Sequence, residues 1–262
     1  RWQILIKVDL ISDTHNNYWD TQPDYESLKT SDYAVFLGDA DDGPEKLLEF
    51  VKDLSNIYKK VLFIDGNHDC YDIDPFEAMD YFDSITQTNP NCHYMGKKIV
   101  MIDNCAFIGA NGWTNLALYN GKKSGHQACV DAWNKTRDVE KIPFKRHVTK
   151  YAIKNYESMM IRLNKVKRYN VNVAMCTHTL PRWECVTEFP TANPALLECF
   201  GNGLTNNFNH DKIHNNVKVW MFGHNHHARD FIKDDILYVS APRGRPGDYL
   251  LTKDWRPKQI II

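Results

Sequence analysis

The sequence predicts an α/β fold, and two features of its pattern support this prediction. Short apolar runs recur along the 262-residue chain, and polar residues follow each of the main runs directly. Stretches with helical periodicity lie between some of the runs, whereas other runs lie beside short turns. Short turns do not suit the long crossovers that a purely parallel sheet needs. We therefore expect a mixed sheet, or two sheets packed face to face.

The predicted strands are apolar along most of their length, as expected of strands that are covered on both faces. Five of them run into polar residues: 4–11, 34–37, 61–64, 171–176 and 217–222. Four more are expected at 99–102, 106–110, 236–240 and 249–251. In open α/β sheets, sites lie beyond the carboxyl ends of the strands, so the polar residues after the first five strands are candidates for a functional site.

Three stretches show the spacing of an amphipathic helix. The first follows Pro44, a favourable first helical residue, and has apolar side chains at three- and four-residue steps up to Tyr58. The second begins at Asp74, where the sequence Asp-Pro-Phe-Glu is typical of a capping box. The third carries one apolar stripe from Val148 to Val166, as expected of a helix face that packs on the core.

Two long segments, 111–146 and 179–216, fit neither helix nor strand. Long connections inside a compact domain are usually functional, so we expect lid loops inserted into one domain of residues 1–262. Their side chains could roof the site and stack on a planar substrate group, or the aromatic ones could merely pack the loops. These residues are Trp113, Tyr119, Trp133, Arg182, Trp183, Phe189 and Phe200.

Composition narrows the class of protein. The chain has 32 Lys and Arg against 33 Asp and Glu, a net charge of −1, which excludes a highly basic nucleic-acid module. Its 43% hydrophobic residues suffice for a substantial core. The seven cysteines include no Cys-x-x-Cys pair, which favours a reducing, cytoplasmic location over a disulfide framework. No apolar run reaches the ~20 residues of a membrane helix, so no membrane partner is expected.

The polar residues at the strand ends form one set. Each short motif is common by itself. Five such motifs in order, each after an apolar run, strongly indicate one shared site. Their donor atoms are carboxylate oxygens, imidazole nitrogens and an amide oxygen, which suit divalent manganese, iron, zinc or nickel. Seven donors are too many for one ion and suit two ions that share a carboxylate. The candidate donors lie at positions 13–15, 39–42, 67–69, 178 and 224–226.

The chain resembles the calcineurin-like metallophosphoesterase superfamily, whose five-block motif it matches in full: Asp13-x-His15, Gly38-Asp39-x-x-Asp42, Gly66-Asn67-His68-Asp69, Thr177-His178 and Gly223-His224-x-His226. The resemblance implies a four-layer sandwich, in which two mixed β-sheets are flanked by helices. It also implies two divalent metal ions, with manganese expected first. It assigns Asp39 to both metals and divides the other ligands: Asp13, His15 and His226 to the first, and Asn67, His178 and His224 to the second.

The predicted catalytic residues are Asp42, Asn67 and His68. The resemblance implies that His68 contacts the phosphate and protonates the leaving oxygen, while a hydroxide that bridges the metals attacks phosphorus. Asp42 matches the acid that orients this histidine in many members and raises its pKa. Alternatively, Asp42 caps the helix that begins at Pro44, and both roles could hold at different times.

The sequence does not decide the substrate class. A nucleotide or other small phosphoester fits the compact length, and Gly43 stands where the superfamily's protein phosphatases have a phosphate-binding Arg. The eight basic residues from Lys145 to Arg168 could be a solvated helix face or could bind RNA or DNA, so a nuclease is the enzymatic alternative. The other alternative is a non-catalytic binding protein on the same fold.

Near the C-terminus, Arg243 and Arg245 could contact phosphate. Nothing in the sequence indicates an oligomeric state.

Overall fold

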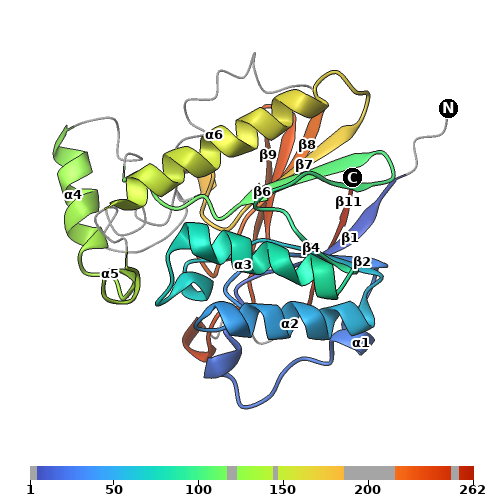
Figure 1. Ribbon diagram of the computed structural model, residues 1–262, viewed down its shortest axis with the longest axis horizontal. Helices are drawn as coiled ribbons and strands as arrows, with labels where there is room; N and C mark the ends of the chain where they lie inside the picture. Colours follow the sequence, from blue (N-terminus) through green and yellow to red (C-terminus); the bar gives the residue numbers. More distant parts are fainter. Residues whose placement is uncertain (1–4, 117–122, 144–146, 186–215, 249–253) are drawn as a thin grey trace.

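The structure, a computed structural model, describes residues 5–116, 123–143, 147–185, 216–248 and 254–262. Within these ranges the chain forms two mixed sheets that face each other, with helices on the outer sides (Figure 1). This is the predicted four-layer sandwich. In the described part of the chain, no helix is both long and apolar enough to cross a membrane.

The first sheet has five strands in the order β11–β1–β2–β3–β4. Strands β1 to β4 are parallel neighbours, and β11 joins the edge in the antiparallel direction. The pattern of apolar runs predicted β1, β2 and β3 but neither β4 nor β11. The bounds are β1 (Lys7–Ile11), β2 (Tyr33–Phe36), β3 (Lys60–Phe63), β4 (Cys92–Tyr94) and β11 (Lys258–Ile261).

The second sheet has six strands in the order β5–β6–β7–β8–β10–β9. The four central strands are parallel and the two edge strands are antiparallel to their neighbours. All but β9 were predicted, and the strand expected at 249–251 lies outside the described residues. The bounds are β5 (Val100–Ile102), β6 (Cys105–Ala110), β7 (Asn172–Thr177), β8 (Val217–Met221), β9 (Arg229–Lys233) and β10 (Ile236–Ser240).

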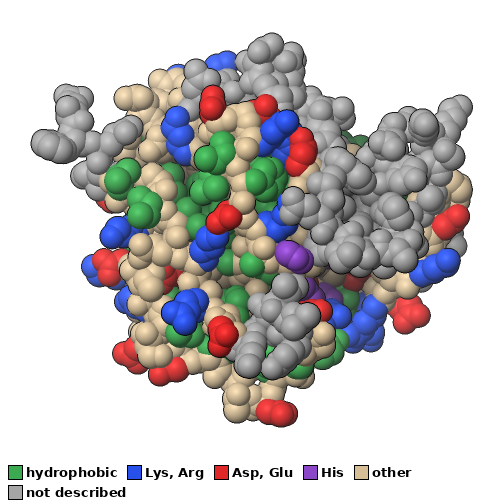
Figure 2. Space-filling view, turned by 180° about the vertical axis from the view of Figure 1, so that it is seen from behind, with side chains coloured by type: hydrophobic (Ala, Val, Ile, Leu, Met, Phe, Trp, Pro, Cys, Tyr) green, Lys and Arg blue, Asp and Glu red, His purple; other side chains and the backbone are tan. Residues whose placement is uncertain are grey.

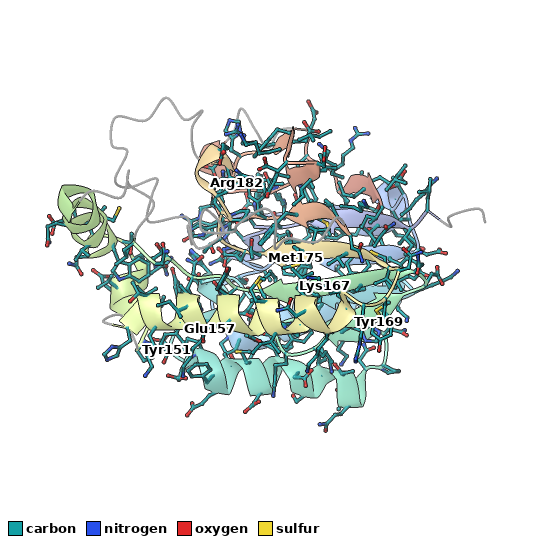
Figure 3. The ribbon with its side chains drawn as sticks, turned by 90° about the horizontal axis from the view of Figure 1, so that it is seen from above. Tyr151, Glu157, Lys167, Tyr169, Met175 and Arg182 are labelled. Atoms are coloured by element: carbon teal, nitrogen blue, oxygen red, sulfur yellow. The ribbon has the colours of Figure 1, made fainter. Side chains whose placement is uncertain are left out.

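Helices cover the outer faces of both sheets. On the first sheet lie α2 (Pro44–Ile57) and α3 (Pro75–Thr88), with α1 (Tyr25–Leu28) beside α2, and α6 (Val148–Val166) lies along the second (Figures 1 and 3). The Asp74 carboxylate accepts a hydrogen bond from the Phe76 N–H and caps α3, as predicted.

The segment 111–146, expected to be a loop, contains two helices: α4 (Lys123–Trp133) and α5 (Asp138–Lys141). A glycine near the start of α4 weakens the helical pattern there, and α5 is only 4 residues long, so the sequence did not predict either helix.

Strand side chains alternate between three apolar layers. On β3, Val61 and Phe63 pack against the helices, whereas Leu62 packs against the other sheet. On β7, Met175 packs in the layer under α6 and Cys176 packs between the sheets (Figure 3). Both faces of the central strands are therefore buried, which explains why they read as unbroken apolar runs.

One of the eight basic residues between positions 145 and 168 is buried and not part of a solvated helix face. Arg162 is 5% exposed, and its guanidinium donates to the backbone carbonyls of Met95, Lys98 and Gly109. A buried guanidinium with these acceptors ties α6 to the second sheet and is not available to nucleic acid. The first two basic residues of the stretch, 145 and 146, lie outside the described residues.

Candidate metal centre

The polar residues that follow five parallel strands meet at one end of the sandwich. Strands β1, β2 and β3 of the first sheet lead to Asp13, Asp39 and Asn67, and β7 and β8 of the second lead to His178 and His224. Carboxylate and imidazole atoms from these turns form three groups, and the atoms of each group lie within 4.8 Å of one another. The structure thus brings all of the predicted ligands into one cluster.

Hydrogen bonds join the two sheets at this end. The Nδ1–H of His178 donates to the Leu37 carbonyl at 2.7 Å, from the second sheet to the first. The His224 N–H donates to the Asp13 carboxylate at 2.7 Å, again between the sheets. Within the second sheet, the Gly223 N–H donates to the His178 carbonyl at 2.9 Å. The protein's own bonds therefore hold these ligand-bearing turns in place.

Five candidate ligands adopt a left-handed backbone conformation. The angle φ is 50° at Asp13, 42° at His15, 57° at Asp39, 73° at His224 and 51° at His226. Such a conformation costs a non-glycine residue roughly 1–3 kcal/mol, and strained residues of this kind cluster at functional sites. Each of these ligands thus lies in a strained turn that the surrounding hydrogen bonds maintain.

The first group of ligand atoms comes from Asp13, His15 and His226. The Nε2 atoms of His15 and His226 are 2.8 Å apart, and His226 Nε2 is 3.8 Å from Asp13 Oδ1. Asp13 Oδ2 is buried and has no hydrogen-bond partner among the described residues. A Cβ atom at Gly223 would lie 2.6 Å from this oxygen, so glycine is needed there. A buried carboxylate oxygen beside two ring nitrogens suits a divalent cation.

The second group comes from Asp39, Asn67, His178 and His224. His178 Nε2 lies 3.0 Å from Asn67 Oδ1, 3.1 Å from His224 Nδ1 and 3.3 Å from Asp39 Oδ2. Two oxygens and two ring nitrogens therefore converge, which again suits a divalent cation of borderline softness.

Asp39 lies between the two groups. Its Oδ2 is 3.3 Å from His178 Nε2 and 3.8 Å from His15 Nε2. Its Oδ1 accepts a hydrogen bond from the His68 N–H at 2.9 Å, which fixes the orientation of the carboxylate. Burial alone would raise the pKa of Asp39, but His178, His68 and His15 hold it well below its ordinary value. An ionised carboxylate that reaches both groups has the placement of a bridging ligand.

The histidine rings are oriented from their outer sides. His226 Nδ1 contacts Asp248 Oδ2 at 2.8 Å, and His178 Nδ1 donates to the backbone. In both rings Nε2 is left to face the cluster. Carboxylate or carbonyl partners of this kind fix the tautomer that binds metal and strengthen the ring as a ligand.

The protonation of these rings also fits cation binding. Burial alone would lower the pKa of His178, but the Asp39 carboxylate raises it to about 10, and a bound cation would displace the proton. Burial lowers the pKa of His15 and His224 well below the ordinary value, which keeps them in the neutral form that binds metal. The residues present therefore fit two divalent cations, with Asp39 shared.

His68 and Asp42 are in direct contact, since His68 Nδ1 lies 2.6 Å from Asp42 Oδ1. Burial alone would lower the pKa of His68, but Asp39 and Asp42 raise it above its ordinary value. Helix α2 begins after Gly43, and no side chain caps its N-terminus. Of the two arrangements considered for Asp42, the structure contains the contact with His68 and not the helix cap, because Gly43 occupies the cap position.

Two acidic residues that support the site were not predicted from the sequence. Asp69 is buried and accepts hydrogen bonds from the N–H groups of Asp39, Ala40 and Gly66 at 2.7, 3.1 and 2.7 Å. It follows His68 directly, so its position in the motif was a usable signal. Asp248 orients a ligand ring but belongs to no motif, and only the fold brings it there.

A third acidic residue comes from the inserted segment 111–146. Asp138 Oδ1 accepts hydrogen bonds from Asn67 Nδ2 at 2.9 Å and from the Tyr71 hydroxyl at 2.7 Å. Because Nδ2 of Asn67 is held by Asp138, the other end of the amide, Oδ1, faces His178. Asp138 is thus the residue that orients Asn67 toward the cluster.

Replacing Asp138 by Ala should therefore lower the affinity for the second metal by about 10- to 100-fold, because the Asn67 amide loses its anchor. Asp138→Asn is the matched control, since its amide oxygen can accept both hydrogen bonds, and its affinity should stay close to that of the wild type. The measurement is a calorimetric titration of manganese into each protein. Equal affinity of the Ala and wild-type proteins would contradict the orienting role.

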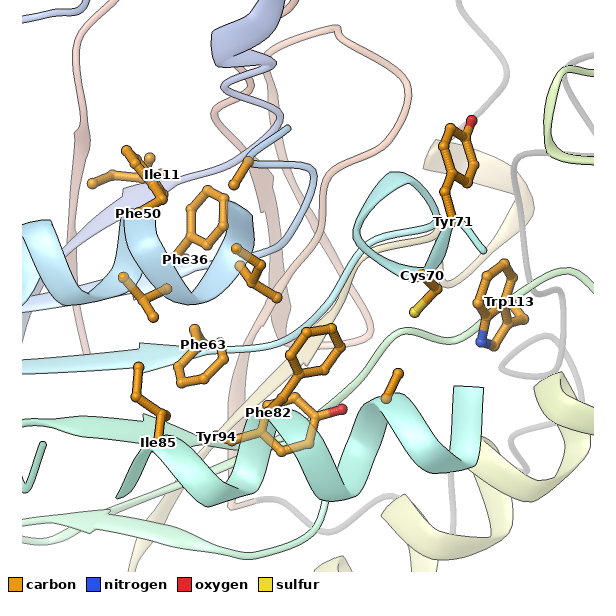
Figure 4. Close-up of a cluster of buried hydrophobic side chains, with 14 of the residues drawn as sticks. Ile11, Phe36, Phe50, Phe63, Cys70, Tyr71, Phe82, Ile85, Tyr94 and Trp113 are labelled. Atoms are coloured by element: carbon orange, nitrogen blue, oxygen red, sulfur yellow. The ribbon is translucent and has the colours of Figure 1, made fainter. Parts of the chain in front are cut away.

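Two aromatic residues expected as a roof over the site are buried elsewhere. Trp113 and Trp133 are 2% and 5% exposed and pack in the cluster between the helices and the first sheet. Figure 4 shows Trp113 in this cluster. Arg182 is also buried, in ion pairs with Glu184 and Asp234. The packing alternative therefore holds for both tryptophans. Tyr119, Phe189 and Phe200 lie outside the described residues, and the side chain of Trp183 is likewise not described.

A cavity of about 310 Å³ opens beside the ligand cluster. Its lining includes His68 and candidate ligands, together with Tyr71, Arg137 and Arg245. Histidine side chains reach the surface near acidic and basic ones on the face drawn in Figure 2. A small anionic molecule could therefore reach the cluster from solvent.

The chain is similar to known proteins over most of its length. A family model described as calcineurin-like phosphoesterase matches residues 6–228. An uncharacterized protein of Acanthamoeba polyphaga mimivirus is 29% identical over 241 residues, which are 87% of this chain and 83% of that protein.

Two solved structures share the fold. The phosphopantetheinyl hydrolase of Mycobacterium tuberculosis superposes with a TM-score of 0.78 at 16% identity, covering 97% of this chain and 95% of that one. The protein TT1561 of Thermus thermophilus superposes with a TM-score of 0.50 at 12% identity, covering 95% and 91%. At these identities the likeness shows the fold alone.

Proposed function

The chain belongs to the calcineurin-like phosphoesterase family, a family of metal-dependent phosphoric ester hydrolases, and we propose that it hydrolyses a nucleotide or another small phosphoester at two divalent cations. The observation that carries the proposal is the placement of Asp39, whose Oδ2 lies between the two groups of ligand atoms. The donors are oxygen and nitrogen without sulfur, and manganese is the cation that we expect first. Iron, zinc and nickel suit the same donors.

The ligand cluster prepares the site for both ions. Two bound cations would lower the pKa of a water between them and stabilise negative charge on the phosphoryl oxygens. Asp39 is held by the His68 N–H, and the rings of His178 and His226 are held by their outer hydrogen bonds. The ligand atoms are therefore already placed, and little reorganisation is needed when substrate binds.

His68 is the proposed proton donor. Its Nδ1 is engaged by Asp42, so Nε2 is the ring atom that faces the cavity. The Tyr71 hydroxyl lies 3.2 Å from Nε2 and limits rotation of the ring. In this structure Nε2 accepts a hydrogen bond from Arg245 Nη2 at 2.9 Å, so proton donation requires the protonated form of the ring. In that form, a proton passed from Nε2 to the leaving oxygen neutralises the charge that develops as the ester bond breaks.

The size of the cavity supports a small substrate. About 310 Å³ is at the lower end of the range of small-molecule pockets. A mononucleotide or a similar phosphoester suits this volume, whereas a nuclease would need a longer surface for the strand.

Replacing Asp42 by Asn should move the basic limb of the pH–rate profile to lower pH. His68 donates a proton, so it is active below its own pKa, and the Asp42 carboxylate helps to raise that pKa. Without that charge the pKa falls, and activity is lost at a lower pH as the pH rises. Bound cations act on His68 in both proteins, so the comparison isolates the effect of Asp42.

The matched control is Asp41→Asn. The Asp41 carboxylate accepts from the Asp42 N–H and makes no hydrogen bond to His68 within the described ranges. The basic limb of Asp41→Asn should shift much less than that of Asp42→Asn, because Asp41 acts on His68 only through a weak Coulombic interaction. An unchanged basic limb in Asp42→Asn would remove Asp42 from the proposed mechanism.

The proposed function is tested by hydrolysis of p-nitrophenyl phosphate and of bis-p-nitrophenyl phosphate with added manganese, iron, zinc or nickel. Metal-dependent hydrolysis of either ester supports a phosphoesterase. Preference for the diester would favour cyclic nucleotides or nucleic acid as substrate and so the nuclease alternative. No hydrolysis of either ester with any of the four metals would favour a binding protein and contradict the proposal.

A further inference from the structure

The backbone of Arg245 is fixed relative to two candidate ligands. Directly before it, the Gly244 N–H donates to the Asp13 carbonyl at 2.8 Å. The Arg245 N–H donates to Asp248 Oδ2 at 2.7 Å, and the same oxygen contacts His226 Nδ1 at 2.8 Å. Hydrogen bonds to Asp13 and Asp248 therefore fix the point from which the Arg245 side chain extends.

The guanidinium of Arg245 lies beside His68 and not beside a carboxylate. Its Nη2 is 2.9 Å from His68 Nε2, and its central carbon lies 4.9 Å from the centre of the Tyr18 ring. Its Nε–H is buried without a hydrogen-bond partner among the described residues. Among those residues, no carboxylate lies within ion-pair distance of the guanidinium, and Asp248 acts on its charge only from farther away. An anionic oxygen would satisfy both the unpaired charge and the unpaired donor.

Other arginines near the site are already engaged. Arg137 forms an ion pair with Asp42 at 2.8 Å, so its charge is compensated. Arg243 is 5% exposed and donates to Gln22 Oε1 at 2.6 Å, which gives it a structural role. Of the two arginines that the sequence suggested as phosphate contacts, Arg245 is the one that faces the cavity.

We propose that Arg245 binds non-bridging oxygens of the substrate's phosphoryl group and favours a phosphomonoester over a diester. The proposal rests on the proposed function. The planar fork of arginine matches two oxygens of one phosphate, and an oxygen held by Arg245 Nη2 would lie beside His68. A monoester phosphate carries close to two negative charges at neutral pH and a diester carries one. An arginine without a carboxylate partner therefore stabilises the monoester more.

The test uses the manganese-loaded protein and inorganic phosphate as the probe. Phosphate binding is measured by calorimetry in the wild type, Arg245→Gln, Arg245→Lys and Arg168→Gln. Arg168 is exposed just after the end of α6, and its variant controls for the loss of one positive charge. Arg245→Gln should weaken phosphate binding about tenfold or more, with Lys in between and Arg168→Gln unchanged. Manganese binding should be equal in all four proteins.

Kinetics with the two nitrophenyl esters complete the test. Arg245→Gln should lower kcat/KM for the monoester at least about tenfold more than for the diester. Phosphate binding equal to that of the wild type, or equal losses on both esters, would overturn the proposal. If the wild type hydrolysed neither ester, the proposed function would fail, while the phosphate titration would still decide whether Arg245 binds the anion.

Discussion

Replacing Asp39 by Asn is expected to lower kcat/KM for phosphoester hydrolysis by about a thousandfold or more. The substitution keeps the size of the side chain but removes the charge that both groups of ligand atoms share. An amide offers one oxygen, and its nitrogen cannot bind a cation. The loss is measured by steady-state kinetics with saturating manganese.

The same variant should lose the stabilisation that manganese gives. At a free manganese concentration about 100 times the Kd, one bound ion raises the free energy of unfolding by about 2.7 kcal/mol. This increment should be present in the wild type and small in Asp39→Asn. Asp42→Asn, three positions away, is the control, because it should keep the manganese-dependent increment. Rates in Asp39→Asn close to those of the wild type would contradict the shared-ligand scheme.

Replacing His68 by Gln should lower kcat about 100-fold or more for substrates with a poor leaving group. Such substrates need a proton on the leaving oxygen as the bond breaks. The p-nitrophenolate ion leaves without one, so kcat for p-nitrophenyl phosphate should fall much less. The comparison between phenyl phosphate and p-nitrophenyl phosphate therefore isolates proton donation from phosphate binding.

Manganese binding distinguishes the two roles that geometry allows for His68. One ring nitrogen of His68 lies in a group of candidate ligand atoms with His15 and Asp39. A proton donor can be removed without loss of manganese, so His68→Gln should bind the ion as the wild type does. Loss of manganese in this variant would make His68 a ligand. His227→Gln, at the partly exposed neighbour of His226, should change neither quantity.

The central strands could be predicted because both of their faces are buried. Residues 34–37 and 61–64 alternate between two apolar layers, so every position carries an apolar side chain. Three edge strands, β4, β9 and β11, lack this signal and were not predicted. In β9, for example, Ile232 is 75% exposed while Phe231 packs against the core, so no continuous apolar run marks the strand.

The ligand positions were visible in the sequence because each lies in the turn directly after a strand. The residues that orient them come from other places in the chain. Asp138 belongs to a four-residue helix of the inserted segment, and Asp248 belongs to a short turn near the C-terminus. Neither has a local pattern that indicates its partner, and only the packing of the two sheets brings it to the site.

The positions of the two inserted tryptophans could not be predicted from the sequence. Trp113 and Trp133 lie in a segment without clear periodicity, so the sequence allowed either a roof over the site or a place in the core. Their burial in the cluster beside the first sheet followed from α4 and α5, which the pattern did not reveal. Side-chain burial in such segments depends on contacts that are distant in sequence.

The most direct test of the two-metal centre is an anomalous difference map from a crystal grown with manganese. We expect two peaks about 3.5–4 Å apart on either side of the Asp39 carboxylate. One peak should lie near Asp13, His15 and His226, and the other near His178 and His224. A single peak, or two peaks that do not share Asp39, would contradict the account.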